Sequence, residues 1–301
     1  MDIFKKWIFL FWVFVIFSMI TLTRLSAQQS NFQIAPSPIA YPYFEEDRVD
    51  VYFGASYIDI AMDNINKKGG DLSGKIRSAI SNHFAIDGAI GLTGLVGSMK
   101  PGIPPLSYDT FLYNSPVPDD KAELSFFAFR GSANIEFQPI HSSVFDIILF
   151  VGPQFTSSTL DITTEYTVVS NFTGDVYSGW EETLTVTSRM YGMQGGIQLD
   201  LKLGNDIMLS PFFMISTSSG SAKMKNLPDG GMGADSISYN MDIPSTTSMS
   251  YGMDIILGNI SIGTVLQQLK SSGKENEDST IIMISVGYGF PVGAENRKDE
   301  K

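Results

Sequence analysis

The sequence has 301 residues, no cysteine and a formal net charge of −12, with 43% hydrophobic and 17% charged residues. The lack of cysteine excludes a disulfide framework, thiolate metal sites and a lipid-modified N-terminal cysteine. An acidic chain without basic clusters is also unsuited to nucleic acid, because neutralising phosphates requires lysine and arginine.

The first 27 residues have the layout of a secretory signal peptide. Lys5 and Lys6 precede an apolar run from residue 7 to about residue 22, and Leu25-Ser26-Ala27 supplies small residues for cleavage. A retained membrane anchor is the alternative, because the run is nearly long enough to span a bilayer. We predict export with cleavage after Ala27. Since this segment carries three basic residues and one acidic residue, the rest of the chain has a charge near −14.

Residues 28–48 contain three prolines and no regular period. We predict a periplasmic lead-in there, with a segment tucked into the folded domain as the alternative. No later apolar run approaches the roughly 20 residues of a membrane helix. Because closed barrels of paired strands are the other way to span a bilayer, alternating strands are the pattern to expect.

Residues 49–290 divide into extended segments in which apolar and polar residues alternate with a period of two. Apolar residues such as Leu72, Phe127 and Tyr251 fall on one face and polar residues on the other. This all-β pattern fits an antiparallel transmembrane up-and-down β-barrel, with lipid outside and a polar lumen. The charged residues expected to face the lumen are Lys75, Arg77, Asp87, Arg130, Glu136, Asp146, Asp200, Lys202 and Asp254.

A soluble sandwich or lipocalin-like barrel would show the same alternation, so connection lengths must distinguish the two. Short connections at 81–82, 139–143, 204–205 and 258–259 alternate with long ones at 98–121, 160–185 and 219–245, and with shorter members near 63–71 and 271–278. Short periplasmic turns and long extracellular loops are typical of outer-membrane barrels. The count is ten strands, with eight or twelve as alternatives, and an even number places both ends in the periplasm.

The connection at 160–185 is rich in threonine and valine on both sides of residues 171–175. This composition predicts that two strands continue past the membrane as a hairpin.

The last segment places Ile282, Ile284, Val286, Tyr288 and Phe290 on one face. It resembles the C-terminal signal of bacterial outer-membrane proteins, in which alternate apolar residues lead to a terminal aromatic. The resemblance implies recognition by the barrel-assembly machinery. With the signal peptide and the strand layout, the chain is similar to small outer-membrane β-barrel proteins of the broad OmpA-like or porin-like kind. The polar tail at 291–301 departs from that pattern, because the aromatic residue is usually the last.

Several outer-membrane barrels are enzymes. The omptin proteases, the outer-membrane phospholipase and the lipid A acyltransferase each use a histidine near the outer surface. The two histidines here, His83 and His141, fall in short turns that we assign to the periplasm and expect to be solvent-exposed. We therefore predict that the chain is not an enzyme. This prediction depends on the orientation of the barrel, because the opposite orientation would place both histidines at the outer surface.

No histidine or aspartate spacing typical of a metal site is present, so no metal or cofactor is predicted. The glycine pair at 69–70 is interpreted as part of a turn. A group of acidic residues is interpreted as a solvated loop, with a divalent-cation site beside lipopolysaccharide as the alternative. These acids are Asp161, Glu165, Asp175, Glu181 and Glu182.

A barrel of this size has an interior that side chains can fill, whereas open channels generally need about sixteen strands. Isolated charges inside would cost several kcal/mol each, so mutual pairing of the inward charges is expected. We favour an ion-pair network that plugs the lumen over a narrow path for ions or small solutes. Inward Gly287 and Gly289 keep the second interpretation open, because they would leave a gap along the last strand.

These observations predict a non-enzymatic outer-membrane protein with a structural or surface-interaction role, in contact with outer-membrane lipid and lipopolysaccharide. A porin-like channel is the second interpretation, an enzyme acting on lipid or peptide at the outer rim the third, and a soluble periplasmic β-domain the fourth.

Overall fold

The computed structural model describes residues 48–62, 65–100, 117–118, 121–203, 207–228, 238–271 and 279–292. The predicted signal peptide, nearly all of the lead-in and the tail beyond Val292 lie outside these residues. The described residues form β-strands joined by turns. None of them belongs to a helix long and apolar enough to cross a membrane.

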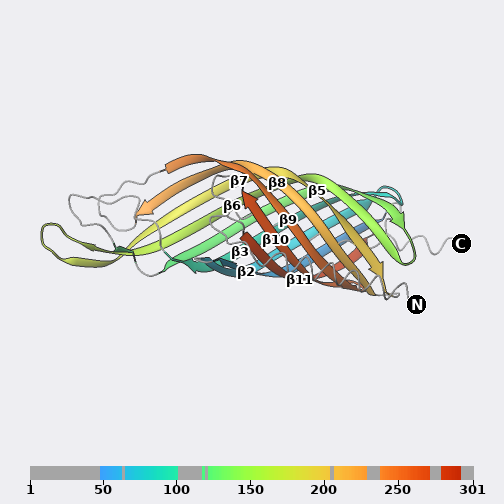
Figure 1. Ribbon diagram of the computed structural model, residues 1–301, viewed down its shortest axis with the longest axis horizontal. Helices are drawn as coiled ribbons and strands as arrows, with labels where there is room; N and C mark the ends of the chain where they lie inside the picture. The colour runs from blue at the N-terminus through green and yellow to red at the C-terminus, as the bar shows by residue number, and fades with distance from the viewer. Residues whose placement is uncertain are drawn as a thin grey trace.

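Ten long strands form a closed antiparallel barrel (Figure 1). Each strand pairs with its neighbours in the chain, and the last strand pairs with the first to close the ring. The predicted up-and-down topology and the count of ten strands are therefore confirmed. The barrel strands are β1 (Val49–Met62), β2 (Ile65–Ala79), β3 (Phe84–Met99), β5 (Ala122–His141), β6 (Phe145–Val169), β7 (Val176–Lys202), β8 (Ile207–Pro228), β9 (Ser238–Leu257), β10 (Ile260–Ser271) and β11 (Ser279–Val292).

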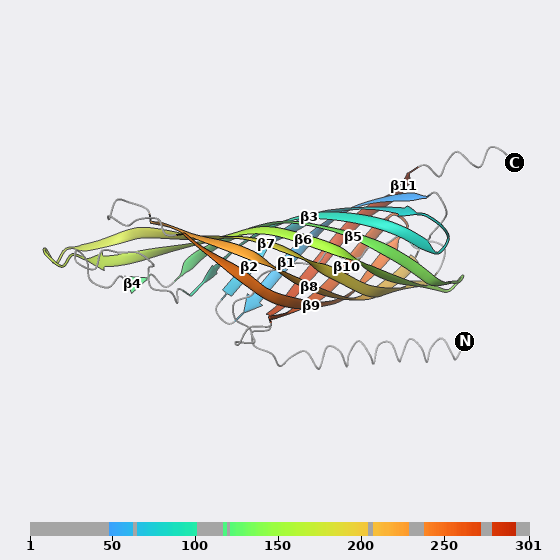
Figure 2. The ribbon, with the colours of Figure 1, turned by 90° about the horizontal axis from the view of Figure 1, so that it is seen from above.

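Short turns join the strands at one end of the barrel, which we call the short-turn end (Figure 2). One of them is the two-residue turn Gly258-Asn259, where Gly258 has a φ of 58°. Such hairpin turns require positive φ, which glycine adopts without steric cost. Val49 in the first strand pairs with Val292 in the last strand, so the chain enters and leaves the barrel at this end. We call the opposite end the hairpin end.

At the hairpin end, β6 and β7 extend beyond their neighbours as a single hairpin with its turn at 170–175, as predicted (Figure 1). The last β5–β6 pair joins Glu123 to Thr163, and the last β7–β8 pair joins Glu182 to Pro228. A two-residue strand, β4 (Val117–Pro118), pairs with β6 beyond the end of β5.

Three predicted connections are longer than the observed ones, because the strands extend into them. Residues 65–71 belong to β2, and the 219–245 connection is largely β8 and β9. Gly69 is part of β2, where a Cβ atom would lie 2.0 Å from the carbonyl oxygen of Gly94. The glycine therefore marks a close approach of two strands and not a turn. Strand β5 runs through Pro139 to His141 across a bulge, where the missing N–H of proline is tolerated.

The outward face of the barrel carries a continuous apolar belt. Large apolar side chains exposed on a soluble protein are scattered, whereas a membrane barrel presents a band of them to lipid. The predicted faces are confirmed, since the apolar residues of each segment point outward. The belt includes Phe53, Tyr57, Leu72, Ile76, Ile90, Leu92, Phe127, Ile135, Leu149, Val151, Tyr191, Met193, Ile197, Phe213, Ile215, Ile255, Ile262, Ile282, Ile284, Val286 and Tyr288.

Candidate functional site

Charged side chains meet inside the barrel near the short-turn end. The ammonium nitrogen of Lys75 lies 3.1 Å from a carboxylate oxygen of Asp87 and 2.9 Å from one of Glu136. The Arg77 guanidinium lies 2.9 Å from Asp50 and 3.6 Å from Glu136. We call these five residues the interior ion-pair cluster. Each charge has an opposite charge beside it, which offsets much of the cost of removing it from water.

Neutral amides extend this cluster across the interior. Asn134 Nδ2 donates to Asp87 at 2.9 Å, and Gln194 Nε2 on β7 donates to Asn134 Oδ1 at the same distance. Strands β1, β2, β3, β5 and β7 are therefore tied together by side chains as well as by the barrel wall. A connected polar network of this kind fixes the relative positions of the strands that supply it.

A second charged group lies at the mouth of the short-turn end. Lys202 Nζ is 2.9 Å from Asp146, which is fully buried, and also donates to the Ser142 carbonyl oxygen at 2.7 Å. His141 Nδ1 lies 2.9 Å from the same carboxylate. Close by, Asp200 accepts hydrogen bonds from Gln198 and Ser210.

Farther toward the hairpin end, Arg130 is paired with Asp71 at 2.5 Å, and Thr93 donates to the same carboxylate at 2.7 Å. All three side chains are buried. The guanidinium lies over Gly91 of the adjacent strand, where a Cβ atom would be 2.5 Å from Arg130 Nε.

The structure thus brings seven of the nine predicted lumen charges into ion pairs, and two of their partners were not predicted. Asp50 and Asp71 lie on the inward face of β1 and β2. The sequence could have indicated that Asp71 faces inward. It is separated by an even number of residues from Lys75 and Arg77, and such residues of a strand lie on the same face. Asp254 is buried on β9, where its carboxylate occupies the space above Gly263.

A cluster of contacting apolar side chains, which we call the apolar layer, lies inside the barrel on the hairpin side of the ion-pair cluster, with the buried Lys67 ammonium 5.7 Å from the centroid of its Phe126 ring, and it was not predicted. Its side chains come from seven of the ten barrel strands and, apart from half-buried Leu160, are buried. A membrane barrel usually has a polar interior, so an apolar layer across it is a departure from the common pattern. The layer consists of Ile58, Ile60, Leu95, Phe126, Ala128, Leu160, Phe212, Val265, Leu269, Ile281 and Met283.

The expected gap at Gly287 is filled by a tyrosine ring. A Cβ atom at Gly287 would lie 1.2 Å from the hydroxyl oxygen of Tyr52 on β1. That hydroxyl is hydrogen-bonded to Ser261 on β10 at 2.7 Å, so the ring crosses the inner side of β11. The prediction that Gly287 leaves a path along the last strand is therefore wrong, because glycine here makes room for an aromatic side chain from the neighbouring strand.

Replacing Gly287 with valine should destabilise the barrel by at least about 1–3 kcal/mol, since the new side chain and Tyr52 cannot occupy the same space. Loss of heat-modifiable migration on cold SDS gels would report the failure to fold. A second substitution, Tyr52→Ala, should restore the folded form. A Gly287→Val variant as stable as the parent chain would contradict this packing.

Both histidines lie at the short-turn end. The exposed His83 is in the β2–β3 turn, with its Nδ1 3.0 Å from the Gln138 carbonyl oxygen. His141 is at the end of β5, and its side chain is 51% exposed. The predicted turn position is right for His83. His141 is less isolated than expected because of its contact with Asp146.

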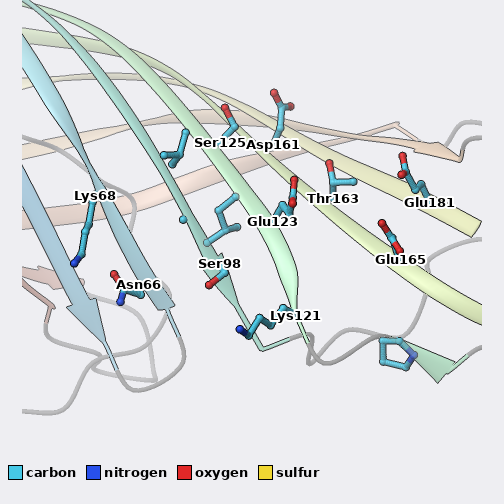
Figure 3. Close-up of a pocket in the computed structure, with 14 residues that line it drawn as sticks. Asn66, Lys68, Ser98, Lys121, Glu123, Ser125, Asp161, Thr163, Glu165 and Glu181 are labelled. Carbon is cyan, nitrogen blue, oxygen red and sulfur yellow. The ribbon is translucent and has the colours of Figure 1, made fainter. Parts of the chain in front are cut away.

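A groove of about 1410 Å³ lies on the outer wall at the hairpin end (Figure 3). It is lined mainly by outward-facing residues of β2, β3, β5, β6 and β7, together with Lys121, the buried Leu124 and Pro118 of β4. Its charged side chains are two lysines and four acids, and one of the acids, Glu123 of β5, lies close to Lys121 (Figure 3). Lys68 and Lys121 lie toward β2 and the start of β5, whereas Glu165 and Glu181 lie on the extended hairpin (Figure 3).

The predicted acidic loop is therefore part of a hairpin wall. Asp161, Glu165 and Glu181 line the groove and Asp175 is at the hairpin turn, whereas Glu182 points to the inner side, where Asn226 donates to it. Burial and the nearby Glu182 carboxylate raise the pKa of Tyr166 in this hairpin to about 12, so its phenol stays neutral. Within the described parts of the chain, no group of three or more acidic or histidine side chains is arranged to hold a metal ion.

No protein-family profile matches the chain, and no curated protein matches it by sequence. Among solved structures, it is similar to the outer membrane protease OmpT from Escherichia coli, with 11% identity and a TM-score of 0.49 over 85% of this chain and 100% of that one. It is also similar to the outer membrane protein OprG from Pseudomonas aeruginosa, with 11% identity and a TM-score of 0.38 over 81% and 96% of the two chains. A major outer membrane protein from Thermus thermophilus has 9% identity and a TM-score of 0.37 over 80% and 99%. The chain has the fold of outer-membrane β-barrel proteins.

Proposed function

We propose that this chain is a non-enzymatic protein of the bacterial outer membrane, with a closed barrel and a structural or interaction role at its outer surface. The observation that carries the proposal is the apolar layer across the interior. A hydrated ion would have to pass both this layer and the ion-pair cluster, and either step removes water from a charge. These two features favour the plugged barrel over a narrow porin-like channel.

The membrane location is supported by the outward apolar belt and by the last strand. Ile282, Ile284, Val286 and Tyr288 are about half-exposed on the outward face of β11, and Phe290 lies on the same face. We infer that this strand is the signal read by the barrel-assembly machinery and that the chain is exported through a cleaved signal peptide. The hairpin end then faces the outside of the cell, in contact with outer-membrane lipid and lipopolysaccharide.

The absence of enzymatic activity is inferred from where the histidines lie. OmpT is a protease, so this fold can carry catalysis. In this chain both histidines are at the short-turn end, away from the groove and the extended hairpin. A histidine-dependent reaction at the outer surface has no base there.

Planar-bilayer recordings test the proposal. The protein refolded without its signal peptide should give no current steps above those of bare lipid, because the interior is filled. Co-flotation with liposomes and heat-modifiable migration serve as controls that the protein has inserted and folded. Reproducible steps from inserted protein, with a reversal potential that follows a salt gradient, would instead establish the channel.

A further inference from the structure

Three basic side chains form a row on the outer wall of the adjacent strands β7 and β8, toward the hairpin end (Figure 1). In the β7–β8 register Arg189 lies opposite Ser221, so Lys223 is its diagonal neighbour. Lys225 is the next outward residue of β8, and all three bases are exposed. Diagonal neighbours in a sheet are roughly 7–8 Å apart, so adjacent members of the row can reach one phosphate group. We call Arg189, Lys223 and Lys225 the basic row.

The basic row begins at the edge of the apolar belt and leads away from it. On β7 the outward residue next to Arg189 on the membrane side is Tyr191, which is 61% exposed and whose ring centroid lies 5.1 Å from that of Phe155. Aromatic side chains in a membrane barrel typically mark the level of the lipid headgroups. Lys223 and Lys225 lie farther toward the hairpin end, and alternate residues of a strand are about 7 Å apart. The row therefore extends from the headgroup level into the region beyond it.

The positive charge of the basic row is not neutralised by its surroundings. Among the residues that the structure describes, none of the three bases is in an ion pair. Two acids flank the row on the neighbouring strands, where Asp242 of β9 is opposite Ser221 and Asp161 of β6 is opposite Thr185. Asp161 accepts a hydrogen bond from Thr185 at 2.7 Å. Three bases against two acids leave this surface positive, and the like charges within the row repel one another until an anion lies between them.

Uncharged donors occupy the outward positions beside the basic row. The hydroxyl groups of Thr187, Ser219 and Ser221 are exposed on the same two strands. An arginine guanidinium binds phosphate through two parallel hydrogen bonds, and lysine binds it as a point charge. Guanidinium, ammonium and hydroxyl groups side by side suit a phosphate ester, whose oxygens accept several hydrogen bonds at once.

We propose that the basic row binds the phosphorylated sugar headgroup of an outer-leaflet glycolipid of the lipopolysaccharide type. The phosphate nearer the acyl chains lies between Arg189 and Lys223, and a second phosphate farther along the headgroup lies at Lys225. The acyl chains follow the belt below Tyr191. A phospholipid has one phosphate, at the edge of the belt, and would leave Lys225 without a contact. This inference rests on the proposed membrane location, with the hairpin end outside the cell, and adds a binding site to it.

Native mass spectrometry of the refolded chain in detergent tests the site. The probes are a rough lipopolysaccharide with phosphorylated core sugars, the same lipid after enzymatic dephosphorylation, and phosphatidylglycerol. The chain should retain the phosphorylated lipopolysaccharide about tenfold better than the dephosphorylated form, as expected for several charge-assisted hydrogen bonds near a surface.

The variants separate the two phosphate positions. Arg189→Gln with Lys223→Gln should abolish the preference for phosphorylated lipopolysaccharide and also weaken the binding of phosphatidylglycerol. Lys225→Gln should weaken the binding of lipopolysaccharide and leave that of phosphatidylglycerol unchanged. Asp242→Asn should strengthen the retention of the phosphorylated lipid by about twofold, because it removes a negative charge beside the row.

The matched control is Lys68→Gln with Lys121→Gln, which removes two positive charges from other strands of the hairpin end. Both lysines are exposed, but Lys68 is 3.9 Å from Asp59 and Lys121 lies close to Glu123 (Figure 3). This control should keep the preference of the parent chain, and heat-modifiable migration shows that each variant has folded. Equal retention of the two forms of lipopolysaccharide, or an equal loss of the preference in the control, overturns the inference.

Fractionation separates this inference from the proposed function. Because lipid retention is measured in detergent, it does not depend on where the chain lies in the cell. A chain absent from the outer membrane refutes the proposed function, whereas a membrane-inserted chain without a preference for the phosphorylated lipid refutes only the site at the basic row.

Discussion

Replacing Arg130 with leucine is expected to lower the free energy of unfolding by about 3–5 kcal/mol, because it leaves the Asp71 carboxylate buried without its cation. The two groups are paired inside the barrel, and the neutral hydroxyl of Thr93 would still donate to Asp71 after the substitution. Urea unfolding of the refolded protein in detergent, followed by far-ultraviolet circular dichroism, measures the change. Trp180 is less suitable as a probe, because it lies in the projecting hairpin.

The double variant Arg130→Leu with Asp71→Leu separates loss of the pair from damage to packing. Replacing both partners of a buried ion pair with apolar residues usually costs little, since no uncompensated charge remains. The double variant should therefore recover most of the lost stability. The control is Lys68→Ala, which removes the exposed ion pair between Lys68 and Asp59 and should lower the free energy of unfolding by less than about 1 kcal/mol. If the double variant were as unstable as Arg130→Leu alone, the uncompensated charge would not be the cause.

Phe126→Ala is expected to cost about 3–5 kcal/mol, since it removes a large ring from the apolar layer and leaves a cavity. Phe126 is 4% exposed and packs within the cluster formed by seven strands. The same unfolding experiment measures the loss. The matched control is Phe172→Ala at the tip of the hairpin, where the ring is 65% exposed.

The control variant should unfold at the urea concentration of the parent chain, because little apolar surface is buried at Phe172. Equal loss of stability in the two variants would mean that the interior ring is no better packed than the exposed one. Such a result would also weaken the proposal of a closed barrel, since the apolar layer carries that proposal.

Much of the barrel could be predicted from the alternation of residue types. A period of two assigns each side chain to the outside or the inside without knowledge of strand pairing. For this reason Lys75, Arg77 and Glu136 were correctly expected on the inside. The connections were harder to predict, because residues such as those at 219–228 and 238–245 are polar and extend the strands beyond the membrane. Polar composition does not by itself distinguish a loop from a strand whose outward face is exposed, even though inward residues such as Ala222 and Ile243 are buried.

The apolar layer could have been predicted in part from places where the alternation of apolar and polar residues is interrupted. At Tyr57-Ile58, Leu95-Val96, Phe126-Phe127 and Ile281 to Ile284, consecutive residues are apolar, so both faces of the strand are apolar at that level. Such pairs interrupt a strict alternation and would have indicated a dry interior. Their alignment into one layer depends on the stagger of the strands, which local patterns do not contain.

The sequence by itself determined the class of fold and the inward or outward direction of the side chains, because these depend on local periodicity. It favoured ten strands over eight or twelve, and the pairing of the first strand with the last decided the number. Tertiary structure alone decided which inward charges pair. Arg130 meets Asp71, 59 residues away, because β2, β3 and β5 lie next to one another in a fixed register. It also decided that Tyr52 fills the space above Gly287 and that five strands and β4 contribute to one groove. These contacts arise from strand tilt and register around a closed ring, which act between residues far apart in the chain.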